Sequence, residues 1–169
     1  QFSPDDRAAW AEGLDIPELS QLGDAGDVDY LFWVGCAGSF DARYKKVSVA
    51  FSRIMQRAGL RFAILGRQEK CNGDPARRTG NEYLAQTLMQ ENIERMNSYN
   101  VKKIVTACPH CLHSLKNEFP QFGGNYQVIY HSELISELLK LGIIQLEKSV
   151  DGSITFHDSC YLGRYNDIY

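Results

Sequence analysis

The segment from residue 101 to 114, VKKIVTACPHCLHS, constrains the fold of this chain more than any other stretch. Residues Ile104 to Ala107 form a short apolar run rich in β-branched side chains, as in a strand that is buried on both faces. A Cys-x-x-Cys pair, Cys108 and Cys111, follows at once and leads into a helix-like stretch. We therefore predict a strand that delivers Cys108 at its carboxyl end, with Cys111 in the first turn of the following helix.

A cysteine at the start of a helix is held in an environment that favours its thiolate. Unpaired backbone N–H groups and the positive end of the helix dipole stabilise the anionic sulfur, which is the form that binds metal or attacks a disulfide. The CPHC pair alone is therefore compatible with a redox dithiol and with half of a metal site. The chain has five cysteines, and the other three must decide between these uses.

Strand-like and helix-like stretches alternate along most of the chain. Apolar runs predict strands at residues 30–34, 62–65, 104–107, 128–131 and 153–157. Helical spacing of apolar residues, with Asp41 and Ser132 as caps, predicts helices at residues 41–58, 80–96 and 133–141. This alternation predicts an α/β fold, in which helices cover both faces of a mostly parallel sheet in Rossmann-like βαβ layers.

The cysteines occupy equivalent places in this pattern. Cys36, Cys71, Cys108 and Cys160 each lie at or just after the end of a predicted strand, where ligands of parallel sheets gather. Nearly equal stretches separate the first three, so the chain returns to the same edge once per βα unit. We therefore expect Cys36, Cys71, Cys108 and Cys111 to meet there. Four thiolates suit an iron–sulfur cluster or zinc, although a zinc site usually has two short Cys-x-x-Cys pairs and this chain has one.

Composition places the chain among ordinary globular proteins. Its 169 residues suffice for one domain with a full core, and residues 1–29 are polar and acidic, which predicts a loosely packed leader or linker with a short helix around Trp10. The net charge of −3 argues against nucleic-acid binding. No run approaches the ~18 apolar residues that cross a bilayer, so we expect a soluble piece. The odd number of cysteines, spread singly apart from Cys108 and Cys111, favours a reducing, cytoplasmic compartment.

Several motifs in order give a family resemblance. The stretches GC at 35–36, EKCNGD at 69–74, CPHC at 108–111 and HDSCYLGR at 157–164 resemble the cysteine-rich CCG domain of heterodisulfide reductase-related iron–sulfur proteins. The stretches DPARRTGNEYLAQ at 74–86 and VTACPHC at 105–111 are most similar to the membrane-associated branch, which passes electrons between electron-transfer flavoprotein and quinone. The resemblance implies a first CCG-type domain at 30–150 and the start of a second, truncated repeat at 151–169, opened by HDSCYLGR.

The resemblance also implies a cofactor and a function. Cys36, Cys71, Cys108 and Cys111 would bind a [4Fe–4S] cluster. The chain would be the electron-transfer portion of an oxidoreductase, relaying electrons between a flavoprotein and a quinone or another cluster, in a parent protein at the cytoplasmic face of the membrane. The family name implies Cys-Cys-Gly, but here Asn72 follows Cys71, so disulfide cleavage at a five-cysteine cluster site is put in doubt. Two alternatives stay open: a thiol–disulfide oxidoreductase that uses CPHC, and a structural zinc domain.

Other polar residues near the cysteines have two readings each. Asn72 is expected either to donate a hydrogen bond to a cluster sulfur or simply to shape a turn. Arg77 and Arg78 either balance the charge of a thiolate-bound cluster or remain solvated. His110 and His113 either contact the cluster or serve as surface and capping residues, which is the commoner role of histidine near a helix start.

Overall fold

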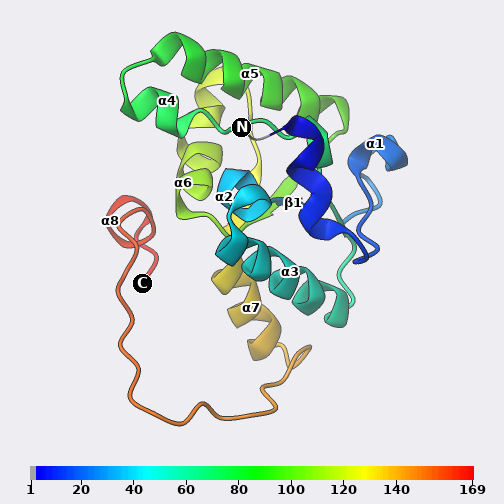
Figure 1. The fold of residues 1–169 in the computed structure, drawn as a ribbon, viewed down its shortest axis with the longest axis vertical. Helices are drawn as coiled ribbons and strands as arrows, with labels where there is room; N and C mark the ends of the chain where they lie inside the picture. Colours follow the sequence, from blue (N-terminus) through cyan, green and yellow to red (C-terminus); the bar gives the residue numbers. More distant parts are fainter. Residues whose placement is uncertain (1–2) are drawn as a thin grey trace.

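The computed structural model describes residues 3–169, and a four-stranded parallel sheet lies at its centre (Figure 1). Its strand order is β2-β1-β3-β4. The strands are β1 (Tyr30–Trp33), β2 (Phe62–Ala63), β3 (Lys103–Thr106) and β4 (Gln127–Tyr130). Every pairing is parallel, as in the register of β1 with β3, where Leu31 lies opposite Ile104. The predicted α/β class and the first four predicted strands are therefore confirmed.

Helices and helical turns connect the strands. In chain order they are η1 (Pro4–Ala11), α1 (Leu19–Leu22), α2 (Gly35–Phe40), α3 (Ala42–Arg57), η2 (Gly66–Gln68), α4 (Asp74–Arg78), α5 (Glu82–Ser98), α6 (Pro109–His113), η3 (Ser114–Glu118), η4 (Phe119–Phe122), α7 (His131–Lys140) and α8 (Gly163–Asn166). The predicted cap Asp41 is confirmed, because its carboxylate accepts hydrogen bonds from the first N–H groups of α3. The predicted cap Ser132 is wrong: Tyr130 is the N-cap of α7, and the Glu133 carboxylate accepts from its N–H.

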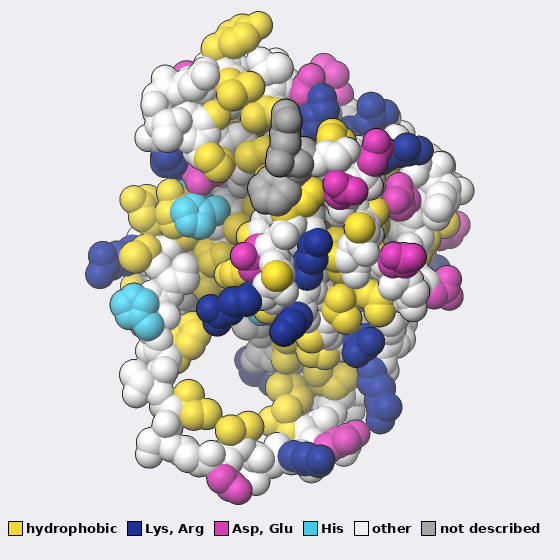
Figure 2. Space-filling view, viewed as in Figure 1, with side chains coloured by type: hydrophobic (Ala, Val, Ile, Leu, Met, Phe, Trp, Pro, Cys, Tyr) yellow, Lys and Arg dark blue, Asp and Glu magenta, His cyan; other side chains and the backbone are white. Residues whose placement is uncertain are grey.

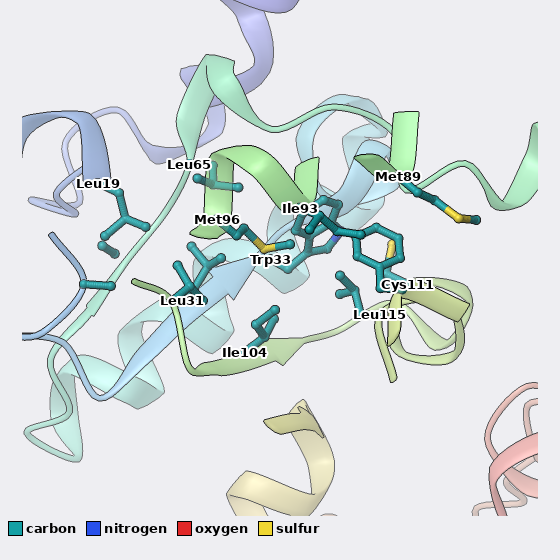
Figure 3. Packing of buried hydrophobic residues seen from close by; sticks show 14 of the residues in the cluster. Leu19, Leu31, Trp33, Leu65, Met89, Ile93, Met96, Ile104, Cys111 and Leu115 are labelled. Atoms are coloured by element: carbon teal, nitrogen blue, oxygen red, sulfur yellow. The ribbon is translucent and has the colours of Figure 1, made fainter. Parts of the chain in front are cut away.

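Alternate residues of the strands face two separate hydrophobic layers. Leu31 and Trp33 belong to the layer that packs on α5. Phe32 lies in the layer that packs on α3 and α7. Figure 1 shows α5 above the sheet and α3 and α7 below it. In Figure 3, Trp33, Ile93 and Cys111 lie close together, so the α5 layer reaches the carboxyl edge of the sheet.

The acidic N-terminal segment is not the loosely packed leader that its composition predicts. Ser3 caps η1, and Trp10 packs edge-on against Phe32 of β1 with ring centroids 5.9 Å apart. Arg7 and Leu19 are also buried. Segment 3–29 therefore contributes to the core, because a few apolar side chains anchor it despite its polar composition.

The predicted fifth strand at residues 153–157 is wrong. These residues form no strand, and Ile154 and Phe156 are 75% and 77% exposed. An alternating apolar pattern becomes a strand only beside a hydrogen-bonding neighbour, and no strand within residues 3–169 lies next to this segment. It is instead part of the long loop drawn in orange in Figure 1. Across the part of the chain that the structure describes, no helix is long and apolar enough to cross a membrane.

Candidate functional site

Four of the five cysteines line one cavity at the carboxyl edge of the sheet. The cavity has a volume of about 450 Å³. Cys36 comes from α2, Cys71 from the loop between η2 and α4, and Cys108 and Cys111 from the start of α6. The structure thus brings together the four residues that the sequence places at one edge. Their role as ligands stays a prediction.

Backbone geometry at the β1–α2 and β3–α6 turns allows this convergence. Gly35 has a φ of +75°, and a Cβ added there would lie only 3.0 Å from the Cys111 sulfur. Only glycine therefore lets the α2 turn approach the CPHC turn so closely. Cys108 is the N-cap of α6, and its N–H donates to Thr106 Oγ1 at 3.3 Å. The strand β3 and the helix α6 together fix both CPHC sulfurs.

The loop that carries Cys71 is fastened to α5 by one buried side chain. Asn92 Oδ1 accepts a hydrogen bond from the Lys70 N–H, and Asn92 Nδ2 donates to the Cys71 carbonyl, both at 3.0 Å. Asn72 Oδ1 in turn accepts from the Asp74 N–H at 3.2 Å. Asn72 also lines the cavity, and its buried Nδ2 group has no hydrogen-bond partner among residues 3–169. Asn72 therefore shapes the turn and keeps one donor unpaired.

The thiols are arranged as two hydrogen-bonded pairs. A hydrogen bond from Cys36 lowers the pKa of Cys71 to about 6, and the same bond, together with burial, raises the pKa of Cys36. A hydrogen bond from Cys111 and the N–H groups of α6 lower the pKa of Cys108 to about 7, while that bond and burial raise the pKa of Cys111. Within the described residues, no group of three or more His, Cys, Asp or Glu side chains could hold a single metal ion. The cavity is therefore lined by two thiol pairs, Cys36 with Cys71 and Cys108 with Cys111.

A buried ion pair joins the N-terminal segment to this site. Arg7 Nη2 lies 3.4 Å from the Cys36 sulfur and 3.3 Å from Glu69 Oε1. The Glu69 carboxylate accepts hydrogen bonds from the N–H groups of Val34 and Gly35, at 3.0 and 2.9 Å. Burial raises the pKa of Glu69, and the positive charge of Arg7 opposes this. The pair therefore fixes the turn that carries Cys36.

Sequence reasoning missed both members of this pair. Glu69 had a usable signal, because it opens the EKCNGD stretch two residues before Cys71. Arg7 had none, since it stands alone in a polar segment far from any cysteine along the chain.

Several charged or polar side chains also line the cavity. Asp74 accepts from Arg78 Nε at 3.0 Å and contacts His110 Nδ1 at 2.9 Å, and all three residues line the cavity. The ring of Tyr161 packs on the His110 ring with a centroid distance of 3.9 Å. His110 and Arg78 therefore belong to the site, held by contacts with their neighbours.

Three residues that the sequence associated with the site lie outside the cavity lining. Arg77 pairs with Glu82 at 2.7 Å. His113 contacts Asn117 Nδ2 at 3.0 Å. Cys160 is exposed and does not line the cavity, and it follows no strand, because the predicted strand at 153–157 does not form.

Comparisons with known proteins identify a family and several relatives. The model of the CCG family, a cysteine-rich domain, matches residues 30–116. The EtfAB:quinone oxidoreductase of Syntrophomonas wolfei is 46% identical, over 96% of this chain and 23% of that protein. The probable iron–sulfur-binding oxidoreductase FadF of Bacillus subtilis is 45% identical, over 94% of this chain and 23% of that protein.

More distant relatives match over nearly the same range. One component of the dihydromethanophenazine:CoB–CoM heterodisulfide reductase of Methanosarcina barkeri is 31% identical, over 97% of this chain and 39% of that protein. The chain thus spans well under half the length of these relatives. No solved structure matches it significantly. The match of the family model, with the cysteine cavity inside its range, shows that this chain belongs to the CCG family of cysteine-rich domains.

Proposed function

We propose that this chain is an iron–sulfur electron-transfer module. Cys36, Cys71, Cys108 and Cys111 hold a [4Fe–4S] cluster, and the module relays single electrons between a flavoprotein and a quinone or another cluster. The observation that carries the proposal is the convergence of four thiols, from three separate turns, on one cavity. The names of the relatives, which include an iron–sulfur-binding oxidoreductase and an EtfAB:quinone oxidoreductase, support it.

The residues around the cavity fit such a group. Four cysteine thiolates are the usual ligands of iron–sulfur clusters. Two of the thiols, Cys71 and Cys108, have lowered pKa values, and ligand thiols must lose their protons to bind metal. The cavity of about 450 Å³ is much larger than the ~30 Å³ share of one water molecule, so it has room for more than a single ion. Asn72 lines the cavity, and its Nδ2 donor has no hydrogen-bond partner among residues 3–169.

The bound cluster would supply a carrier for one electron at a time. The chain would hold its ligands and set the surrounding electrostatics. Arg7 donates hydrogen bonds to the Cys36 sulfur, and Asn72 offers another donor. Such hydrogen bonds stabilise the more negative, reduced state and so raise the reduction potential. We place the parent protein at the cytoplasmic face of the membrane, with an electron-transfer flavoprotein or another redox protein as its partner.

Iron analysis after anaerobic reconstitution tests the proposal. We expect a brown protein with about four iron and four sulfide ions per chain, broad absorption in the visible blue, and an electron paramagnetic resonance signal after reduction. Replacing Cys36, Cys71, Cys108 or Cys111 with Ser should remove or severely weaken cluster binding.

Cys160→Ser is the matched control, because Cys160 is exposed and lies outside the cavity. It should retain the iron content of the original chain. Absence of iron from the reconstituted chain, or equal loss in the Cys160→Ser variant, would contradict the proposal.

One observation favours a second function, that of a thiol–disulfide oxidoreductase. Cys108, with a pKa of about 7 at the N-cap of α6, and the buried Cys111, with a raised pKa, have the asymmetry of a redox dithiol. Insulin reduction by the iron-free protein, with Cys108→Ser as control, separates the two functions. Cysteine-dependent turnover without metal would favour the dithiol, and a colourless protein with one equivalent of zinc would favour the zinc alternative.

A further inference from the structure

The outward face of α3 carries a stripe of positive charge. Its core side buries Ser48, Phe51, Ser52 and Met55. The opposite side carries four exposed cations, which lie on one face of the helix because they are three, seven and four residues apart: Arg43, Lys46, Arg53 and Arg57. In Figure 2, dark blue side chains cross the lower middle of the molecule where Figure 1 shows α3, while magenta ones gather mainly at the upper right. The charge is therefore segregated on this face.

Most of these cations lack an acidic partner in the chain. Arg57 alone in the stripe has one, a contact of 3.5 Å with Glu147 between two exposed side chains. For Arg43, Lys46 and Arg53, residues 3–169 provide no carboxylate at ion-pair distance. The helix itself contains no acidic residue between Ala42 and Arg57, in a chain whose net charge is −3. Positive charge left unpaired at one place, in a chain that is acidic overall, is available for an external partner.

This face adjoins the cysteine cavity. A surface depression is lined by Ala37, Asp41, Arg43, Tyr44, Lys46 and Val47. Ala37 also lines the cysteine cavity. Two apolar side chains in this depression are accessible, with Tyr44 41% and Val47 38% exposed. Asp41 is the one anion there, and its carboxylate caps the N–H groups of α3.

We propose that the α3 patch, formed by Arg43, Tyr44, Lys46 and Val47, is the docking surface for a redox protein with an acidic surface. The proposal rests on the proposed function, since it places the partner of the electron relay beside Cys36. A small surface with cations beside two apolar side chains suits a transient electron-transfer contact, which is typically small and steered by charge. The patch fits such a partner better than a lipid surface, because its apolar part is one ring and one valine.

The first experiment measures docking without requiring a cluster. Fluorescein-labelled oligoglutamate is titrated with the protein at low salt, and binding is followed by fluorescence anisotropy. The R43E/K46E variant should bind at least ~10-fold more weakly than the original chain. The K102E/K140E variant has the same charge change on exposed residues, at the amino end of β3 and at the end of α7, and should keep its affinity within about twofold.

The second experiment measures electron transfer from the reduced, reconstituted protein. Each cluster gives one electron to one oxidant, either the anionic cobalt(III)–EDTA complex or the cationic hexaammineruthenium(III) ion, and the metal of the oxidant becomes divalent. Oxidation by the anion should slow as ionic strength rises, and R43E/K46E should lose that dependence while K102E/K140E keeps it. A sample without iron would overturn the proposed function, while the oligoglutamate titration would still decide the docking surface.

Other occupants of the patch give distinct results. Equal loss of oligoglutamate binding in both double variants, or no loss in either, would overturn the proposal. Preferential binding to phosphatidylserine vesicles, abolished in R43E/K46E, would assign the patch to a membrane instead. A dimer that is seen in sedimentation and is abolished in R43E/K46E would assign the α3 patch to a second copy of the chain. Protection of Lys46 from amine labelling in the parent protein would assign the patch to another part of the same polypeptide. Circular dichroism checks that each variant folds.

Discussion

Replacing Arg7 with Met tests whether the N-terminal segment is an integral part of the cysteine site. Arg7 and Glu69 form an ion pair at 3.3 Å, and their side chains are only 7% and 2% exposed. Methionine keeps an apolar stem of similar length and removes the charge and the donors. The Glu69 carboxylate would then be buried without its cation, in a place where burial already raises its pKa.

The structure sets the size of the expected loss. Breaking a buried ion pair by removing one partner costs about 3–5 kcal/mol, because the other charge is left uncompensated. Glu69 would keep its hydrogen bonds from the N–H groups of Val34 and Gly35, at 3.0 and 2.9 Å. We therefore expect the lower end, about 3 kcal/mol, for Arg7→Met. With a urea m value of about 1–3 kcal/mol per molar, the midpoint should fall by about 1–3 M.

Urea unfolding of the iron-free protein, followed by circular dichroism, measures this loss. Arg67→Met is the matched control, because Arg67 pairs with Asp5 at 3.6 Å while the two side chains are 71% and 78% exposed. The control should lose less than about 1 kcal/mol. The double variant R7M/E69Q should lose less than R7M alone, since no charge then remains buried. Equal losses for R7M and R67M would refute the reasoning.

Two further substitutions probe the surroundings of the site. Gly73→Ala should destabilise the fold more than Gly80→Ala in urea unfolding. Both glycines have positive φ, which costs about 1–2 kcal/mol for alanine. Only at Gly73 would the new Cβ also clash, because it would lie 2.8 Å from the Ala85 carbonyl oxygen. Burial lowers the pKa of His131 in the folded chain below the ordinary value of 6.5. Below pH 6.5 the unfolded chain therefore binds a proton more readily than the folded chain does. The free energy of unfolding consequently falls as the pH decreases from 6.5 toward the lowered pKa. His131→Phe should reduce this loss, and the same change at the exposed His157 should not; equal pH profiles for both variants would contradict this.

Local signals predicted the scaffold of the site well. The run before Cys108 is apolar and β-branched because both faces of β3 are covered: Ile104 lies in the layer on α5 and Val105 in the layer on α3 and α7. That cover leaves a clear trace in the sequence. The return of the chain to one edge follows from the parallel direction of the strands, whose carboxyl ends share that edge. The meeting of Cys36, Cys71 and Cys108 could therefore be expected without any contact information. The positions of the strands and the shared edge of the sheet could therefore be predicted from the spacing of apolar residues along the chain.

Features that depend on single tertiary contacts were not readable. The burial of Arg7 depends on where Glu69 lies in space, and no periodic pattern marks an isolated arginine in a polar segment. The run at residues 153–157 shows the reverse error, because its alternation satisfies the rule for a strand while no hydrogen-bonding neighbour lies beside it within residues 3–169. For Asn72 the sequence left two roles open, shaping a turn or donating a hydrogen bond to a cluster sulfur. Its Oδ1 atom accepts a hydrogen bond within the turn, while its Nδ2 group has no partner among residues 3–169.

The charges around the cavity divide into two groups with different sensitivity to salt. The cations in or at the cavity are held by carboxylates of the chain, Arg7 by Glu69 and Arg78 by Asp74. A buried pair such as Arg7 with Glu69 is screened little, whereas the unpaired, exposed cations of α3 are screened within about 10 Å at 0.1 M salt. Raising the ionic strength should therefore weaken association with an acidic partner while leaving the reduction potential nearly constant. A potential that follows salt as steeply as the association rate would show that the α3 patch sets the electrostatics of the cavity itself.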